Sequence, residues 1–267
     1  TTSAVSRHVA RLETHMGGRL LHRTTRSLAL TELGTLVHEG SLRMTAVGRE
    51  VHALAGSYSE RPNGVIRVSA PIVFGQLWLA PRLPAFLDRH PEVSVRLTLV
   101  DRTVNLIDEG EDLAIRIARE LPPGLAARPL CPVRYVLVAA TGYLARHGSP
   151  TAPDDLPQHP CVCLRHSEID QIWTLQRADE TVSVTVPGRL SVNNSAAVMS
   201  IVEAGGGVGL VTDFAAQPAI DAGRVQLVLP DWEFADTHRR MAHAVYVPGP
   251  YLALKVRAFI DYLALAS

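Results

Sequence analysis

The sequence has little of what several protein classes depend on. Its 267 residues include a single lysine, three cysteines and 5% aromatic residues, and 26 basic residues balance 26 acidic ones. The zero net charge excludes a field of one sign over the whole surface, so a charged partner must meet a local patch. Few aromatic residues exclude a base-stacking nucleic-acid sheet, and three cysteines are too few for a disulfide framework.

Long hydrophobic runs are also missing. No stretch reaches the roughly eighteen apolar residues that a membrane span requires, and the first residues lack the pattern of a signal peptide. We therefore expect a cytoplasmic globular protein with no membrane partner. The sequence starts with Thr1 rather than Met, and its first six residues resemble the middle of a motif, so we expect the natural chain to begin earlier.

Positive charge gathers at the N-terminal end, where residues 1–30 hold five arginines against the single acid Glu13, a surplus of +4. Residues 3–16 carry apolar side chains at helical spacing, at Val5, Val9, Leu12 and Met16. This pattern predicts an amphipathic helix with Thr2 or Ser3 as its N-cap and Gly17-Gly18 at its end. Ser6, Arg7 and Arg11 then point away from the apolar face.

Two further elements are predicted before residue 64. Residues 20–30 indicate two short strands around a basic turn, which makes a winged arrangement with the preceding helix. The stretch from Thr31, a predicted cap, to about Ser59 lacks proline and repeats apolar residues at helical spacing, so it predicts one long helix. Because few neighbours in its own chain can cover that helix, we expect it to pack against another copy. Residues 61–64, Arg-Pro-Asn-Gly, then break the helix as a hinge.

Strand and helix patterns alternate in the remaining two hundred residues. The predicted strands are 65–69, 93–99, 113–117, 135–139, 182–186, 208–211, 225–229 and 244–247, and the predicted helices are 77–88, 106–111, 194–204 and 252–264. Such alternation predicts parallel pairing with crossover helices. We expect two α/β lobes with a cleft between them, and we expect the last strand and helix to return to the first lobe.

The sequence resembles a LysR-type transcriptional regulator over essentially its whole length. The N-terminal segments that carry the resemblance are Ser3-Ala4-Val5-Ser6-Arg7, Leu12-Glu13, Gly17, Leu20-Leu21, Arg23 and Leu30-Thr31-Glu32-Leu33-Gly34. The downstream segments are residues 79–86, 90–93, 110–116 and 204–209. Their order and spacing agree with the family pattern.

The resemblance implies an α/β chain in three parts. A partial winged helix-turn-helix, with the recognition helix and wing, would occupy residues 1–30, and a linker and dimerisation helix residues 31–61. A two-lobed periplasmic-binding-protein-like effector domain would occupy residues 62–267, with lobe I at about 64–134 and 238–267 and lobe II at about 135–237. The family's first helix and most of its second would precede Thr1.

The resemblance also implies a function and partners. It implies a bacterial regulator that binds double-stranded promoter DNA as a homodimer or homotetramer and works with RNA polymerase. The regulator would change state when it binds a small-molecule effector. A two-lobed solute receptor without DNA function is the alternative, which the basic N-terminal end disfavours. An enzyme on the same two-lobed fold is a third possibility.

Seven residues are candidates for DNA contact. Thr2, Ser3, Ser6, Arg7 and Arg26 match DNA-binding positions of the family, and Arg11 and Arg23 are basic candidates with a more ambiguous role. A recognition helix places its N-terminal side chains in the major groove. Arg7 can therefore bond two acceptors of guanine or grip a phosphate, and Arg26 matches a wing position that reaches the minor groove or the backbone. Arg23 fits a structural salt bridge under the wing equally well, and Ser6 a solvated helix face.

Eight residues at three predicted strand ends form the candidate effector site. They are Ser69, Ala70, Pro71, Asp101, Arg102, Thr103, Asn194 and Ser195. Ligands of open α/β sheets lie beyond the strand C-termini, where helix starts expose N–H groups, so these donors and an arginine favour a small anion such as a carboxylate. The alternatives are that Ser69, Asn194 and Ser195 cap helices, and that Arg102 bonds Asp101 or a surface acid.

We predict no catalytic residue, no cofactor and no metal site. The glycine-rich residues 205–209 follow a helix and precede a strand, the reverse of the order in a dinucleotide site, so we interpret them as a helix end. Cys161 and Cys163 lie two residues apart on one predicted strand face and lack the second ligand pair of a structural zinc site. Their expected role is packing.

Overall fold

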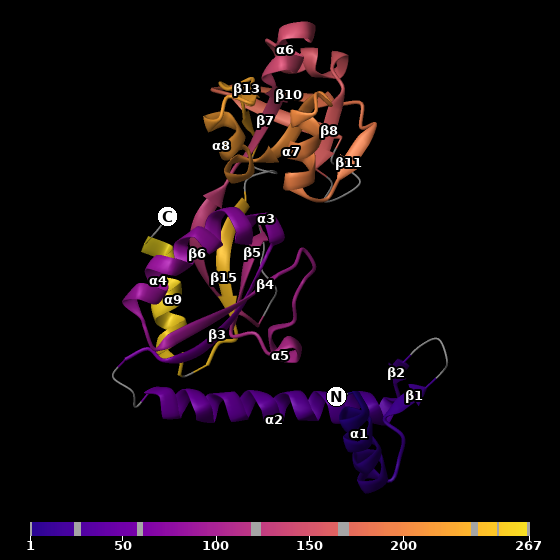
Figure 1. The fold of residues 1–267 in the computed structure, drawn as a ribbon. Helices are drawn as coiled ribbons and strands as arrows, with labels where there is room; N and C mark the ends of the chain where they lie inside the picture. Colours follow the sequence, from indigo (N-terminus) through magenta and orange to yellow (C-terminus); the bar gives the residue numbers. More distant parts are fainter. Residues whose placement is uncertain are drawn as a thin grey trace.

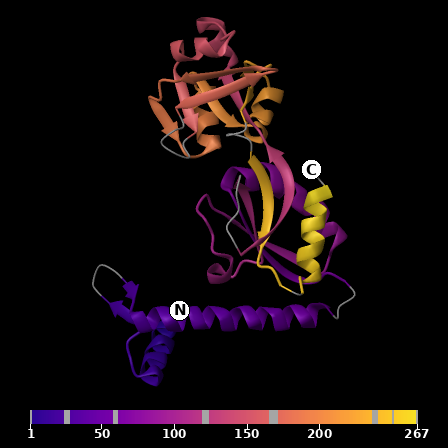
Figure 2. The ribbon, with the colours of Figure 1, turned by 180° about the vertical axis from the view of Figure 1, so that it is seen from behind.

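The structure, a computed structural model, describes residues 2–23, 28–57, 61–118, 124–164, 171–235, 240–249 and 251–265. These residues form an N-terminal helix with a hairpin, one long helix, and two stacked α/β lobes, which we call lobe I and lobe II (Figure 1). The long helix lies along the side of lobe I that faces away from lobe II, as the views from front and back agree (Figures 1 and 2).

The N-terminal part follows its predicted pattern. Helix α1 (Thr2–Met16) ends at Gly17, whose φ of 68° lies in the left-handed region that glycine adopts without strain. A carboxylate oxygen of Glu13 then accepts hydrogen bonds from the backbone N–H of Leu20, at 2.9 Å, and of Leu21, at 3.3 Å. These bonds fix the turn into the hairpin of β1 (Leu21–Arg23) and β2 (Leu28–Leu30), which pair antiparallel. The predicted helix, its glycine end and the two strands are confirmed.

The predicted long helix is also confirmed, as α2 (Glu32–Ser57). The Thr31 hydroxyl accepts a hydrogen bond from the Gly34 N–H at 2.9 Å, so Thr31 is the predicted cap. Gly34 has a packing reason to be glycine, because an added Cβ would lie 2.0 Å from the Leu20 carbonyl oxygen. Because Gly34 has no side chain, α2 can approach the turn that follows α1 closely.

Lobe I is built on a five-stranded sheet in the order β4-β3-β5-β15-β6. The strands are β3 (Gly64–Ala70), β4 (Val93–Leu99), β5 (Leu113–Ala118), β6 (Ala126–Val133) and β15 (Arg240–Tyr246). The predicted parallel pairing is confirmed for β3 with β4 and β5. It is wrong for β15, which pairs antiparallel with β5 and β6, because this strand returns from lobe II in the opposite direction.

The helices of lobe I cover that sheet and supply much of its core. One continuous helical stretch consists of α3 (Ile72–Phe74), a π-helical turn (Gly75–Leu79), a 3-10 turn (Ala80–Arg82) and α4 (Leu83–Arg89). It begins five residues before the predicted start at residue 77. Its buried side chains Phe74, Leu79 and Phe86 share a core with Phe259 of α9 (Leu254–Leu265). The short helix α5 (Leu106–Glu109) lies between the sheet and α2 (Figure 1).

Lobe II holds a second five-stranded sheet, in the order β11-β8-β12-β7-β13. Its strands are β7 (Tyr135–Ala140), β8 (Cys161–Leu164), β11 (Leu190–Val192), β12 (Val208–Thr212) and β13 (Val225–Val228). Its helical elements are α6 (Thr141–His147), a 3-10 turn (Pro153–Gln158), α7 (Ser195–Glu203) and α8 (Asp213–Asp221). The pairing here is also mixed, since β7 runs antiparallel to β12 and β13.

A smaller antiparallel sheet completes lobe II, in the order β10-β9-β14. Its strands are β9 (Ile172–Arg177), β10 (Glu180–Thr185) and β14 (Glu233–Phe234). The strand predicted at 182–186 belongs here and not in a parallel sheet, because the turn at residues 178–179 folds it back onto β9 as a hairpin. The chain passes between the lobes once at Arg134, between β6 and β7, and again between β14 and β15. The predicted domain limits stay predictions.

Among the helices of the described ranges, none is long and apolar enough to cross a membrane.

Candidate functional site

The predicted DNA-binding residues are described in part. Ser6, Arg7 and Arg11 are exposed on α1, and Arg7 and Arg11 lie one helical turn apart on the same face. Thr2 and Ser3 belong to α1 and Arg23 to β1, but their side chains lie outside the described part of the structure, as does the whole of Arg26. The structure therefore shows three of the seven as exposed side chains of α1.

A cavity of about 450 Å³ lies between the two lobes. Lobe I contributes Pro71 and Asp101, and lobe II contributes Asn194, Ser195 and Thr212. A second hollow of about 290 Å³ lies within lobe I and shares Pro71 and Asp101 with the first. Its lining includes the other four predicted effector residues, Ser69, Ala70, Arg102 and Thr103. The eight residues thus line two adjoining hollows that meet at Asp101.

The Asp101 carboxylate bridges the lobes. One oxygen accepts the backbone N–H of Ile72, at the start of α3, at 3.0 Å, and the other accepts the side-chain amide of Asn194 at 3.4 Å. Asn194 in turn caps α7, because its carbonyl oxygen accepts the N–H groups of Ala196 at 3.0 Å and Ala197 at 3.1 Å. Several backbone donors that the sequence offered to a ligand are therefore occupied by protein groups.

Two buried hydroxyls in these hollows lack a hydrogen-bond partner among the described residues. Ser69 is 2% exposed and Thr212 is 5% exposed, and neither side-chain oxygen is bonded. Ser69 is not the helix cap that one alternative proposed, because α3 starts after Pro71 without a side-chain cap. Ser195 is not a cap either, because Asn194 has that role. Unbonded buried hydroxyls are costly, and a ligand that bonds them would recover that cost.

Sequence reasoning missed Thr212 and the contact that it accompanies. Thr212 is the polar last residue of the fully buried strand β12, and that position was the available signal. Two residues further along the chain, Phe214 of lobe II meets Phe74 of lobe I edge to face, with ring centroids 5.4 Å apart. Phe74 also stacks on Trp78 at 4.8 Å. The lobes are therefore joined by an aromatic contact as well as by Asp101.

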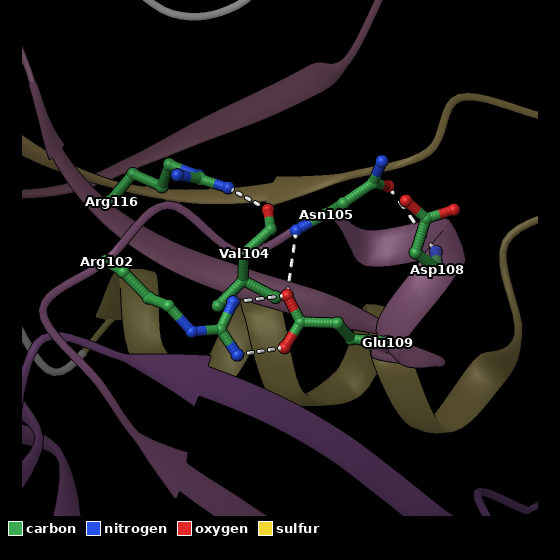
Figure 3. Close-up of polar contacts among 6 residues, drawn as sticks. All are labelled: Arg102, Val104, Asn105, Asp108, Glu109 and Arg116. Atoms are coloured by element: carbon green, nitrogen blue, oxygen red, sulfur yellow. Dashed lines mark hydrogen bonds and ion pairs between the residues drawn. The ribbon is translucent and has the colours of Figure 1, made fainter. Parts of the chain in front are cut away.

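Arg102 takes the role of an ion-pair partner of a surface acid, the alternative left open above (Figure 3). Its two terminal nitrogens bond the two carboxylate oxygens of Glu109 at 2.6 and 2.5 Å. This hydrogen-bonded pair raises the pKa of Arg102 and lowers the pKa of Glu109. The same carboxylate accepts the backbone N–H of Asn105 at 3.2 Å, so it closes the loop between Arg102 and α5.

Arg116 lies beside this loop (Figure 3). One terminal nitrogen donates to the Val104 carbonyl, and its buried Nε has no bonded partner within the described residues. Burial lowers the pKa of this guanidinium below its ordinary value. Arg116 therefore adds a partly desolvated positive group to the wall of the lobe I hollow.

The three cysteines are buried, and the glycine-rich segment lies between α7 and β12. Cys131, Cys161 and Cys163 are all buried, and burial raises the pKa of Cys161 to about 12 and that of Cys131 to about 11. In the described ranges, no group of three or more His, Cys, Asp or Glu residues could hold a metal. Gly205 and Gly207 follow α7 with φ of 86° and 113°, so this segment ends a helix before β12.

Two family models match the chain. The model described as LysR substrate binding domain matches residues 59–266, and the model described as bacterial regulatory helix-turn-helix protein, lysR family, matches residues 1–35. Together they cover α1, the hairpin, the first residues of α2 and both lobes. Regulators of this family are not enzymes.

Related proteins resemble the chain over nearly all its length. It is 37% identical to a probable HTH-type transcriptional regulator LtrA of Klebsiella pneumoniae, over 99% of this chain and 85% of that protein. It is 30% identical to the HTH-type transcriptional activator TtdR of Escherichia coli K12, over 99% of this chain and 84% of that one.

Solved structures show the same architecture. The full-length Vibrio cholerae virulence activator AphB matches with a TM-score of 0.69 and 26% identity, over 98% of this chain and 89% of AphB. CrgA of Neisseria meningitidis, a LysR-type transcriptional regulator, matches with a TM-score of 0.68 and 29% identity, over 100% and 90% of the two chains. On the motifs, the fold and these matches, the chain belongs to the LysR family of transcriptional regulators.

Proposed function

We propose that this LysR-type regulator binds promoter DNA as an oligomer and is switched by a small anionic metabolite that enters the cavity between its lobes. The observation that carries the proposal is the arrangement of the chain. An exposed basic helix, α1, adjoins one end of α2. The cavity that both lobes line is separated from α2 by lobe I. Such an arrangement separates a DNA-contacting surface from a ligand-contacting one, as a switch requires.

The proposed DNA contacts come from α1 and the wing. Ser6, Arg7 and Arg11 would face the major groove or flanking phosphates, since they are exposed on one helix. Thr2, Ser3, Arg23 and Arg26 join them on the family pattern alone. Arg7 is the central residue in this proposal, because a guanidinium can bond the two acceptors of guanine or hold a phosphate.

The proposed assembly is a homodimer or homotetramer formed through α2. Large apolar side chains on that helix are open to solvent in the single chain, with Leu36 61% exposed, Met44 77% and Val47 57%. Apolar side chains along a long helix favour packing against a second helix. We propose that the assembled regulator acts in the cytoplasm and works with RNA polymerase.

The proposed effector is an anion because of the charges around the two hollows. Among the described residues that line the two hollows, three are arginines, namely Arg102, Arg116 and Arg240, and one is an acid, Asp101. Glu109 already balances the charge of Arg102. Asp101 now holds the Ile72 N–H at the start of α3. A carboxylate ligand would compete with Asp101 for that donor and repel it, so ligand binding would displace the Asp101 side chain. Ser69 and Thr212 would then find partners on the ligand.

Two measurements on the full-length protein test this function. Gel shifts with duplexes from its own locus should show affinity that falls steeply with salt. Isothermal titration with a panel of small carboxylic acids and their neutral amides should show tighter binding for at least one acid than for its amide. Equal binding of every acid and its amide would overturn the anionic effector, and salt-independent or absent DNA binding would overturn the regulator.

A further inference from the structure

One short segment of lobe I reaches from the cavity to α2. It starts at Asp101, which lines the cavity and bonds Asn194 of lobe II, and it ends with α5. Among the described elements of lobe I, α5 packs most extensively against α2. Both ribbon views show α5 on the α2 side of the lobe (Figures 1 and 2). Residues 101–109 therefore touch the ligand cavity at one end and the linker helix at the other.

Internal bonds hold this segment together. The Arg102–Glu109 pair closes it across seven residues with two hydrogen bonds (Figure 3). The Asn105 side chain caps α5 by accepting the N–H of Ile107 at 3.1 Å, and Glu109 accepts the N–H of Asn105 at 3.2 Å. Val104 and Leu106 are buried at its middle. These bonds and the two buried side chains connect the Asp101 end of the segment to α5, which gives a displacement at Asp101 a structural route to that helix.

We propose that residues 101–109 couple the cavity to α2, with Arg102 and Glu109 as the positioning pair that makes the segment rigid. When Asp101 leaves Ile72 and Asn194, the segment turns and shifts α5 against α2, which carries the DNA-contacting end of the chain. The inference rests on the proposed function in one respect, namely that the effector displaces Asp101. Nothing else in the coupling requires a ligand.

A ligand-free perturbation can therefore test it. Asn194→Asp keeps a side chain that caps α7 but removes the amide donor and sets a second carboxylate against Asp101. We expect amide hydrogen exchange in α2 of the full chain to become about fivefold faster, at the low end of the range typical for coupled sites. Exchange in β12, a buried strand of lobe II, should change little.

The coupling pair is tested in the same background. In Asn194→Asp protein, adding Glu109→Gln should reduce the change in α2 exchange to less than about twofold, because the segment is no longer closed. The matched control is Glu203→Gln, which breaks the Arg224–Glu203 pair of lobe II, with side-chain exposures of 52% and 33% against 61% and 30% for Arg102 and Glu109. This control should leave the fivefold change intact.

A second variant guards against a local folding defect. Arg102→Lys keeps the charge but loses the two-bond fork, so it should also suppress most of the change in α2 exchange. Unaltered α2 exchange in Asn194→Asp protein, or a full response that survives both Glu109→Gln and Arg102→Lys, would overturn the coupling. Because no ligand or DNA enters this test, its failure is distinct from failure of the effector titrations.

Discussion

The carboxylate of Asp101 in lobe I accepts the side-chain amide of Asn194 in lobe II at 3.4 Å while it also accepts the Ile72 N–H at 3.0 Å. The negatively charged side chain of Asp101 thus lies where the N-terminal ends of α3 and α7 come together. An acidic ligand must displace that anion, whereas a neutral ligand need not. The charge at position 101 should therefore govern which ligands bind and how tightly.

Replacing Asp101 by Asn should strengthen binding of small carboxylic acids. The substitution keeps the size of the side chain and removes one negative charge about 4 Å from an incoming carboxylate, worth about 1 kcal/mol or more. We expect affinity for an acid ligand to rise about tenfold in isothermal titration. Asp221→Asn, on the exposed end of α8, is the control and should leave affinity unchanged. Weaker binding of acids to the Asp101 variant would contradict displacement.

Replacing Arg7 by Ala should weaken DNA binding. The loss of a guanidinium that contacts a base edge or phosphate costs about 1 to 3 kcal/mol. Gel shifts of full-length protein at matched salt measure the change, and loss of preference at one base pair would indicate a base contact. Arg189→Ala provides the control, because Arg189 is an exposed arginine of lobe II. Equal affinity of the Arg7 variant and the parent would remove Arg7 from the interface.

Replacing Thr31 by Ala should destabilise the start of α2. The Thr31 hydroxyl caps the helix through the Gly34 N–H, and loss of such a cap costs about 0.5 to 2 kcal/mol. The measurement is the free energy of unfolding from denaturant titration, followed by circular dichroism. Thr45→Ala is a suitable comparison, because that hydroxyl bonds the Ser41 carbonyl inside the same helix without capping it. If Thr31 caps α2, Thr31→Ala should lower the free energy of unfolding distinctly more than Thr45→Ala does. Equal losses in the two variants would contradict the cap.

The buried thiol of Cys161 should make the protein sensitive to alkaline pH. Burial raises its pKa to about 12, whereas an unfolded cysteine ionises near pH 8.5. The folded state favours the protonated thiol, so its contribution is fully present below about pH 8.5 and is lost as pH rises towards 12. The unfolding free energy between pH 8 and 10 should therefore fall less steeply in Cys161→Ala than in the parent. Identical slopes would show that this thiol ionises in the folded state as readily as in the unfolded one.

Local elements of the fold were predictable because they depend on neighbours in the chain. The spacing of Val5, Val9 and Leu12 predicts α1, Gly17 its end, and Thr31 the start of α2, since capping and amphipathic periodicity act over one or two turns. The eight residues of the candidate effector site were proposed for a similar reason. Each ends or follows a strand or begins a helix, and each of the eight lines at least one of the two adjoining hollows.

Strand direction and side-chain partners were decided only in three dimensions. The antiparallel entry of β15 depends on where the chain re-enters lobe I after more than a hundred residues, and no local pattern records that path. Arg102 was expected to face a ligand, but Glu109 lies seven residues on and takes both ends of its guanidinium once α5 folds back. Asp101 and Asn194 are 93 residues apart and meet only because the lobes stack. The sequence by itself determined the family, those elements that have a clear local pattern and the residue types at the cavity, whereas the tertiary structure decided which of those groups bond one another, since such pairing depends on distances that chain order does not specify.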